Sequence, residues 1–362
     1  MDFGLSEDQL LFKTSLRRFL DTECPTTRVR TVMESDDGHD PALWRALAAM
    51  GVAGLMIPEA HGGAGLELLD AALAAEELGR ACTPGPFLAA TMAAVAFASC
   101  DDEALRGRWL PRLASGDTLL TVALPERLGD VDPETPATRV EGGALTGEKS
   151  LVPAAAVAEA LVVSATDADG PGLWIVERAA PGVEVTALKG TDMTRRVDRV
   201  RFAGAPATKL AAGRAAAARV RDAGLVLLAA DAYGGSMRCV EMTRDYALTR
   251  EQFGRTIASF QGVKHQLADL VTDLEPACSL WWYAAHAFDH IQDRAERHAA
   301  LAKAHLADLY DRAIRTAIEL HGGIGFTWEF DLHLWFRRAM FDRAFLGEAA
   351  YHRARAADLG GW

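Results

Sequence analysis

Two stretches in the last third of the chain combine residue types that core packing does not require. They are YALTREQFGRTIASFQGVKHQLADL (246–270) and IELHGGIGFTWEFDLHLWFRRA (318–339). In the first stretch, Arg250 ends a long helical run, and Phe253 begins a turn before the next run. A guanidinium at such a corner is either an ordinary surface charge or a bidentate clamp for a phosphate group. The sequence alone leaves both interpretations open.

The second stretch places glycines at the end of a predicted helix. Gly322, Gly323 and Gly325 remove side chains at this point. Such glycines either cap the helix or let the phosphates of a ligand approach the backbone closely. Each stretch by itself is a weak signal, and the elements that carry them decide how they are interpreted.

Those elements follow the order helices, strands, helices. From Ser6 to about Gly116 the apolar spacing of three and four predicts helices, starting at a capping box in SEDQ and interrupted by a loop at MIPEAHGGAGL. From about Thr121 to Leu210, short β-branched runs predict a small antiparallel β domain. Long helices then return, with an apolar stripe typical of a bundle core, whose members are Leu225, Leu228, Ala232, Gly235, Cys239, Met242 and Tyr246.

The predicted fold class is therefore α+β and mainly α. We expect an N-terminal helical domain over residues 1–118, a middle antiparallel β domain over 119–212, and a C-terminal four-helix bundle over 213–362. The sequence contains no internal repeat and no low-complexity linker between these parts.

Composition excludes several classes of function. The chain has 362 residues, of which 50% are hydrophobic, and a formal net charge of -12. This charge argues against a nucleic-acid surface, which needs clustered Lys and Arg. The five cysteines are scattered without metal-binding spacing, and they read as small apolar residues of a reducing compartment. The N-terminus lacks the apolar run of a signal peptide or membrane anchor, so we expect a cytoplasmic protein without a metal.

Taken together with this order of elements, the two stretches resemble the signatures of the acyl-CoA dehydrogenase family of flavoproteins. VAGLMIPEAHGGAGLELLDAALAAEELGRA is similar to the family's PEEYGGxG…EELGR region, and RWLPRLASGD to its WLPxLxxGe segment. GEKSLVPAAAVAEALVVSA is similar to the middle-domain pattern GxKxxVxxAxxAD. The chain thus resembles the family over nearly its whole length, as a short actinobacterial type. The resemblance implies two helical domains flanking a β domain, FAD at a subunit interface, and an acyl-CoA thioester clamped against the flavin.

The resemblance also implies which residues bind FAD. Arg250, Gln252 and Phe253 match the RxQFG positions that contact the pyrophosphate and adenine side of the cofactor. The other matching positions are Gln261, the glycine pair Gly322 and Gly323, and Glu319, which stands where the family has glutamine. A carboxylate near a diphosphate is repelled unless a cation such as Arg250 compensates. In the middle domain, ALPERLGDVD replaces the family's TEPxxGSD segment, and Ser150 to Pro153 replace its W-[IV]-T-N.

The family's chemistry needs a carboxylate base, and the chain departs from the family there. The usual glutamate lies 23 residues beyond the second glycine of the pair, which here is Leu346, and the minority position lies 26 residues before the RxQFG arginine, which here is Gly224. Neither can abstract a proton. The backbone N–H of Leu346 would still hold the thioester oxygen, as it does in the family.

Four nearby residues are candidates for a substitute base or a structural role. Glu348 is either the base or an acid favoured at a helix N-terminus. Asp231 is either a base or a satisfied buried polar group. His321 and His352 fall near the implied site, where a single histidine is more often structural.

Three functions remain open from the sequence. The first is an FAD-dependent acyl-CoA dehydrogenase with a non-standard base, and Glu348 is the most plausible such base. The second is a non-catalytic partner subunit of a heterotetrameric acyl-CoA dehydrogenase for bulky or steroid-type thioesters. The third is another flavin reaction on a CoA thioester. All three predict an oligomer, either of this chain alone or with a related chain, and an electron-transfer flavoprotein or similar acceptor.

Overall fold

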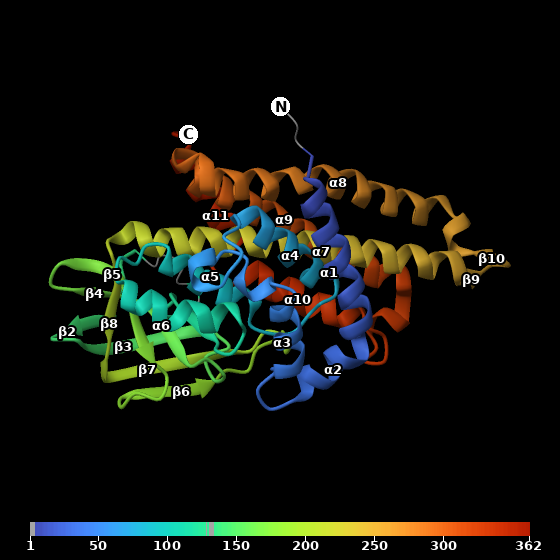
Figure 1. Cartoon of the computed structure of the whole chain (residues 1–362). Helices are drawn as coiled ribbons and strands as arrows, with labels where there is room; N and C mark the ends of the chain where they lie inside the picture. The colour runs from blue at the N-terminus through green and yellow to red at the C-terminus, as the bar shows by residue number, and fades with distance from the viewer. Residues whose placement is uncertain (1–3, 128, 130–133) are drawn as a thin grey trace.

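The computed structural model describes residues 4–127, 129 and 134–362 (Figure 1). Part of ALPERLGDVD, the segment that replaces the family's TEPxxGSD, lies outside the described residues. Over the described residues, helices precede and follow a β-sheet, as the sequence predicts. The change of element type falls between Ala114 and Leu120, and again between Ala212 and Arg214.

The N-terminal part is helical. Its α-helices are α1 (Glu7–Glu23), α2 (Thr26–Glu34), α3 (Pro41–Ala49), α4 (Leu68–Arg80), α5 (Phe87–Phe97) and α6 (Glu103–Ala114). The predicted capping box is confirmed, because Ser6 and Gln9 exchange side-chain and backbone hydrogen bonds at the start of α1. The short 3-10 helix η1 (Val52–Gly54) precedes the predicted loop, and η2 (Glu59–His61) lies within it, where Gly62 and Gly65 have positive φ.

The middle part is one sheet of eight described strands. They are β1 (Leu120–Ala123), β2 (Arg139–Glu141), β3 (Ala144–Pro153), β4 (Ala160–Asp167), β5 (Gly170–Glu177), β6 (Val183–Ala187), β7 (Val197–Pro206) and β8 (Thr208–Ala212). The sheet order is β6-β7-β3-β2-β4-β5-β8, with β1 also paired to β4. The pairing is mainly antiparallel, as predicted, but β1 and β2 each run parallel to β4. Short β-branched runs predict strands without fixing which neighbours they pair with.

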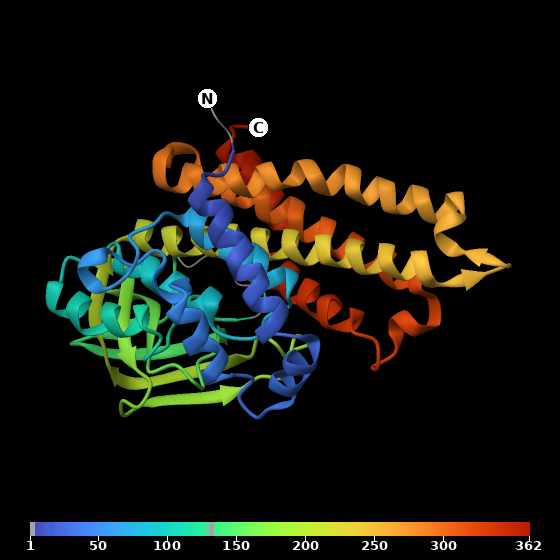
Figure 2. The same cartoon turned by 45° about the vertical axis from the view of Figure 1, so that its right-hand side comes forward.

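The C-terminal part is built on three long helices. They are α7 (Arg214–Thr249), α8 (Gln261–His290) and α9 (Gln292–His321), followed by α10 (Leu332–Ala344) and α11 (Ala349–Leu359). The hairpin of β9 (Glu251–Gln252) and β10 (Arg255–Thr256), with the 3-10 helix η3 (Ile257–Ser259), joins α7 to α8, and the 3-10 helix η4 (Gly322–Phe326) follows α9. The sheet lies beside the start of α7, whereas the hairpin projects from the opposite end of the bundle (Figure 2). The predicted apolar stripe on α7 faces the core, with Met242 and Tyr246 half-buried.

The N-terminal and C-terminal helices share one hydrophobic core. Glycines allow α4 and α7 to cross in backbone contact, since a Cβ on Gly234 would lie 1.9 Å from the carbonyl oxygen of Glu76. A Cβ on Gly79 would lie 2.2 Å from the carbonyl oxygen of Asp231. Both glycines are therefore needed for this close crossing, and the crossing fixes where α7 lies relative to the N-terminal helices.

Replacing Gly234 by alanine is expected to destabilise the protein by about 1–3 kcal/mol or more, because the added methyl group forces the two helix backbones apart. Chemical denaturation measures this change. Gly107→Ala is the matched control, since a Cβ at Gly107 in α6 meets nothing within 4 Å. The control gains helix propensity and should be stabilised by about 0.5–1 kcal/mol. Equal effects of the two substitutions would contradict the steric explanation.

The remaining expectations on composition can be compared with the structure. All five cysteines are free, and four are buried, so they serve as small core residues. Over the described part of the chain, no group of His, Cys, Asp or Glu side chains is arranged to hold a metal ion. No helix in the same residues is long and apolar enough to cross a membrane.

Candidate functional site

The two signature stretches meet at the hairpin end of the bundle. Tyr246, one turn before Arg250, stacks on His321, with ring centroids 4.3 Å apart. The Tyr246 hydroxyl donates a hydrogen bond of 3.4 Å to the carbonyl oxygen of His321. The His321 ring is buried and bonds the carbonyl oxygen of Ala317 at 2.7 Å, so its role is structural. The sequence assigned Tyr246 to the core stripe, and its role in joining the two stretches was missed.

The residues expected to bind the cofactor are exposed around this end. Arg250 forms no ion pair with any described residue, which leaves its guanidinium free for an anion. Phe253 is 93% exposed and has a φ of 54°, an unusual conformation for a residue with a side chain. Gln252 and Gln261 are also exposed, the latter in the first turn of α8. The Phe253 ring packs edge-on against Phe260, with ring centroids 6.1 Å apart.

The glycine pair lies at the end of α9. Gly322 has a φ of 66°, and a Cβ on either Gly322 or Gly323 would meet nothing within 4 Å. The backbone here is therefore open to a ligand. Glu319, in the last turn of α9, is exposed, and it places a negative charge beside this backbone, as the sequence predicted. The open backbone and the free guanidinium fit the pyrophosphate of FAD.

The two positions at which counting places the base meet at the opposite end of α7. A Cβ built on Gly224 would lie 2.8 Å from Cδ1 of Leu346 and 2.8 Å from Cε of Met92. Residue 346 is located by its distance from the glycine pair, and residue 224 by its distance from the RxQFG arginine. Because these two independently located residues touch each other, each location supports the other. Leu346 is 4% exposed, and its side chain fills the space over Gly224. Apolar atoms therefore occupy both positions at which the sequence motifs predict a base. Met92 on α5 was not anticipated.

Glu348 lies two residues beyond Leu346. No contact of its side chain with Leu346, Gly224 or Met92 is seen among the described residues. It is the residue that precedes α11, with extended backbone angles, and its side chain is exposed. The side chain makes no capping hydrogen bond to α11. The two residues that precede Glu348, Leu346 and Gly347, both have positive φ. The proposed base role of Glu348 stays a prediction.

Asp231 lies two turns further along α7, in a buried ionic cluster. Arg195 donates to both Asp231 and Asp342, the latter at 2.7 Å. Arg338 is fully buried and lies 3.2 Å from Asp231 and 2.9 Å from Asp192. Burial raises the pKa of the Asp342 carboxyl well above its usual range. Asp231 is thus a satisfied structural group, one of the two interpretations that its sequence context allowed.

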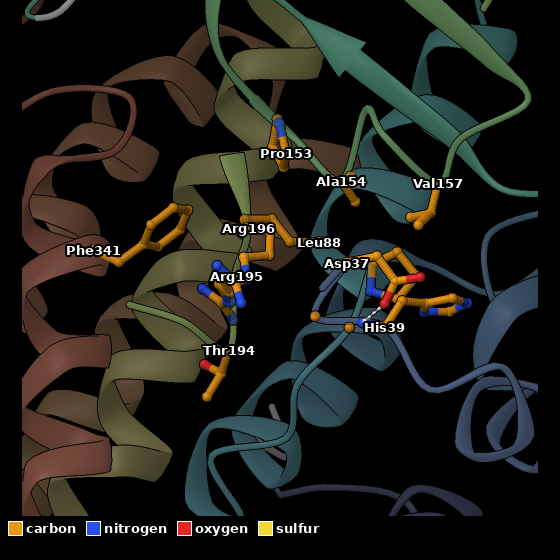
Figure 3. A pocket seen from close by; sticks show the side chains of 14 residues that line it. Asp37, His39, Leu88, Pro153, Ala154, Val157, Thr194, Arg195, Arg196 and Phe341 are labelled. Atoms are coloured by element: carbon orange, nitrogen blue, oxygen red, sulfur yellow. Dashed lines mark hydrogen bonds between the residues drawn. The ribbon is translucent and has the colours of Figure 1, made fainter. Parts of the chain in front are cut away.

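A pocket opens between the N-terminal helices, the sheet and α10 (Figure 3). Pro153 lines it from the segment that takes the place of the family's W-[IV]-T-N, Ala154 lines it from the next position, and Leu88 lines it from α5. Arg195 lies over the ring of Phe341 at 5.4 Å from its centroid. Apolar side chains line this narrow pocket together with the charged and polar side chains of Asp37, His39, Thr194, Arg195 and Arg196.

The two ends of the site are too far apart to serve one ligand within one chain. Helix α7 runs unbroken for 36 residues. Gly224 and Arg250 are 26 positions apart along it. At 1.5 Å per residue they are separated by about 39 Å, more than the diameter of a small domain. The exposed end and the contact of Leu346 with Gly224 therefore form two separate parts of the candidate site.

Family models match both helical parts of the chain. Residues 6–117 match the acyl-CoA dehydrogenase N-terminal domain, and residues 212–359 match the acyl-CoA dehydrogenase C-terminal domain. The chain belongs to the acyl-CoA dehydrogenase family. IpdE2 of Mycolicibacterium smegmatis, named an acyl-CoA dehydrogenase, is 34% identical over 347 residues, which cover 95% of this chain and 96% of that protein.

Solved structures agree with this acyl-CoA dehydrogenase assignment. The Tcur3481-Tcur3483 steroid ACAD, solved as a variant, is 32% identical with a TM-score of 0.91, covering 98% of both chains. The ChsE4-ChsE5 complex from Mycobacterium tuberculosis is 29% identical with a TM-score of 0.91, covering 100% of this chain and 99% of that one. A structure described as an FAD-dependent dehydrogenase is 26% identical with a TM-score of 0.87, covering 100% of both chains. The predicted acyl-CoA dehydrogenase fold is confirmed.

Proposed function

We propose that this chain is the base-less subunit of a two-chain, FAD-dependent acyl-CoA dehydrogenase. The observation that carries the proposal is the contact of Leu346 with Gly224 and Met92. At that point both family solutions for a base are replaced by apolar atoms. A related chain would supply the carboxylate that removes the proton from Cα of the thioester.

The retained half of the cofactor site supports this role. Arg250, Gly322 and Gly323 offer a guanidinium and open backbone at the exposed end of the bundle. We propose that they hold the pyrophosphate of an FAD whose ring lies against the related chain. Arg250 would offset the charge of Glu319, because opposite charges close to a diphosphate favour the bound anion. When bound, FAD accepts the hydride, and these residues only bind and orient it.

The relatives point the same way. Two of the similar structures carry titles that name two different chains, Tcur3481-Tcur3483 and ChsE4-ChsE5. The first title also names a steroid ACAD. By this likeness we propose a bulky, steroid-type CoA thioester as the substrate class of the assembly. The electron acceptor stays a prediction.

The second candidate is an enzyme that works alone with Glu348 as base. The observation in its favour is that the Glu348 side chain is exposed and makes no capping hydrogen bond to α11. A turn of the Leu346–Gly347 backbone would be needed to bring the carboxylate to Cα. General-base assistance is worth typically about 10²–10⁴-fold, so the two candidates differ strongly in activity.

The deciding experiment expresses the chain alone and together with a related chain that carries the family glutamate. Flavin absorbance and anaerobic bleaching by acyl-CoAs are recorded for each preparation. We expect little bound flavin and no bleaching from the chain alone, and both from the mixture. Bleaching by the chain alone that disappears with Glu348→Gln would establish the second candidate. Glu184→Gln, at an exposed position of β6, is the control for general loss of a surface carboxylate.

A further inference from the structure

Two arginines lie close to the two predicted base positions. Arg221 precedes Gly224 by three residues on α7, which is a rise of about 4.5 Å along the helix. Arg355 follows His352 by three residues on α11. The His352 ring is buried, and its Nε2–H donates to the carbonyl oxygen of Leu346 at 2.8 Å, so its role is structural. Arg221 and Arg355, the arginine pair, therefore lie beside the contact of Leu346 with Gly224.

Three carboxylates surround the arginine pair. Glu134 accepts a hydrogen bond of 2.7 Å from Nη1 of Arg221, and the same oxygen lies 3.6 Å from Nη2 of Arg355. Asp222 accepts from Nε of Arg221 at 2.9 Å, and Glu296 accepts from Nη2 of Arg355. The five side chains thus form a network of two positive and three negative charges. Because Arg221 is fully buried, its charge depends on these carboxylates.

Glu134 is the carboxylate of this network that the fold holds least firmly. Asp222 and Glu296 lie within α7 and α9, whereas Glu134 lies in a turn before β2. Its side chain is 28% exposed, so it can leave the network toward solvent without unwinding a helix. Without Glu134 the network would hold two charges of each sign. The place of Glu134 is therefore one that accepts a single oxyanion.

The arginine pair also keeps two donors that no carboxylate uses. Nη2 of Arg221 and Nε of Arg355 are buried, and neither donates a hydrogen bond to any described residue. Nη2 of Arg221 lies 3.5 Å from a carboxylate oxygen of Glu296 without the geometry of a hydrogen bond. Buried donors without acceptors are costly. A guanidinium fork matches two oxygens of a carboxylate or phosphate, whereas Glu134 meets both arginines through the single oxygen Oε1.

We infer that Arg221 and Arg355 form a binding site for an oxyanion of a CoA thioester, and that Glu134 fills this site until the ligand binds. A carboxylate on the acyl group and a phosphate of CoA share the required chemistry. The inference rests on the proposed function in one respect, since it takes a CoA thioester as the ligand. It goes beyond that function by giving this chain a charged recognition site that is separate from the base and from the FAD-binding residues.

The test compares two pairs of ligands whose members differ in one anionic group. Adipoyl-CoA and hexanoyl-CoA have acyl groups of equal carbon number and differ by a terminal carboxylate, whereas CoA and 3′-dephospho-CoA differ by one phosphate. Calorimetry measures their affinities for the full chain. The wild type should prefer the anionic member of one pair by about 10–100-fold, the usual value of hydrogen bonds to a charged group. The pair that shows this preference identifies the source of the oxyanion.

Glu134→Gln distinguishes an occupied anion site from a structural ion pair. Glutamine has the same shape without the charge, so it competes less for the arginine pair. The affinity for the preferred anionic ligand should therefore rise by about tenfold, while that for its less charged twin stays the same. Glu141→Gln, at an exposed position of β2, is the matched control and should change neither affinity.

Arg355→Gln tests the arginine pair itself. Arg355 is the better choice for substitution because it is half-buried, whereas Arg221 is fully buried. The preference for the anionic ligand should fall to about one. Arg353→Gln, at an exposed position of the same helix, should leave the preference unchanged.

Three results would overturn the inference. The first is equal affinity of the wild type for the members of both ligand pairs. The second is an affinity of Glu134→Gln for the anionic ligand that is unchanged or lower, as the loss of a structural ion pair would give. The third is a preference that persists in Arg355→Gln. These results are independent of the proposed function, which flavin bleaching decides without any anionic acyl group.

Discussion

Leu346→Glu is expected to increase flavin reduction by about 10²–10⁴-fold, the usual value of a general base, at a second flavin ring of the assembly that lies beside residue 346 of this chain. The new carboxylate would lie where Leu346 now covers Gly224, beside Met92. Apolar surroundings raise the pKa of a carboxyl group, which suits a base that works near neutral pH. The backbone should tolerate the change, because Leu346 already has positive φ and glutamate is no more branched at Cβ.

The measurement is anaerobic bleaching of the flavin in the two-chain assembly, with the base of the related chain replaced by glutamine. Leu346→Gln is the matched control, since it has the same shape without a proton acceptor. Gly224→Glu should be far less effective, because its Cβ would meet Leu346 and Met92 at 2.8 Å. If Leu346→Glu were no faster than Leu346→Gln, no flavin ring could lie beside this residue.

Arg338→Met is expected to lower the free energy of unfolding by about 3–5 kcal/mol, the usual cost of leaving buried charges without their partner. The guanidinium is fully buried and lies 2.9 Å from Asp192 and 3.2 Å from Asp231. It also donates to the carbonyl oxygen of Thr83 at 2.9 Å. These partners come from the loop between β6 and β7, from α7, and from the end of α4, so one side chain joins all three parts of the fold.

Denaturant titration measures this loss. Arg244→Met is the matched control, because Arg244 and its partner Asp245 are both 60% exposed and such pairs contribute about 0–1 kcal/mol. Arg338→Lys should fail to rescue, since an ammonium cannot reproduce the planar fork of donors that reaches four partners, Thr194 being the fourth. A loss from Arg338→Met as small as that from the control would show that the buried cluster does not stabilise the fold.

The sequence predicted much of the fold because local patterns carry that information. Ser6 and Gln9 form the expected capping box, and Leu225 and Leu228 face the core as their spacing indicated. The strand pairing was less predictable, because β1 and β2 find a parallel neighbour in β4 through long-range packing that no short run of residues encodes.

The candidate site divides in the same way. The sequence predicted Arg250, Gly322 and Leu346 as site positions, because motifs and the number of residues between them can be found along the chain. It could not show that Tyr246 stacks on His321, or that Met92 completes the apolar contact, because these pairs are brought together only by helix packing. From the sequence, Asp231 was either a base or a structural group. Its ion pairs with Arg195 and Arg338 show that it is a structural group.

By itself, then, the sequence determined the family, the order of elements and the absence of glutamate at residues 224 and 346. Only the tertiary structure decided that these two positions are one place, filled by a leucine side chain. Only the unbroken course of α7 placed Arg250 about 39 Å from that place. The physical reason is the same in both cases. The spacing of motifs along the chain shows which residue stands at each position of the site. The distances between these residues depend on how the helices pack, which the spacing does not show.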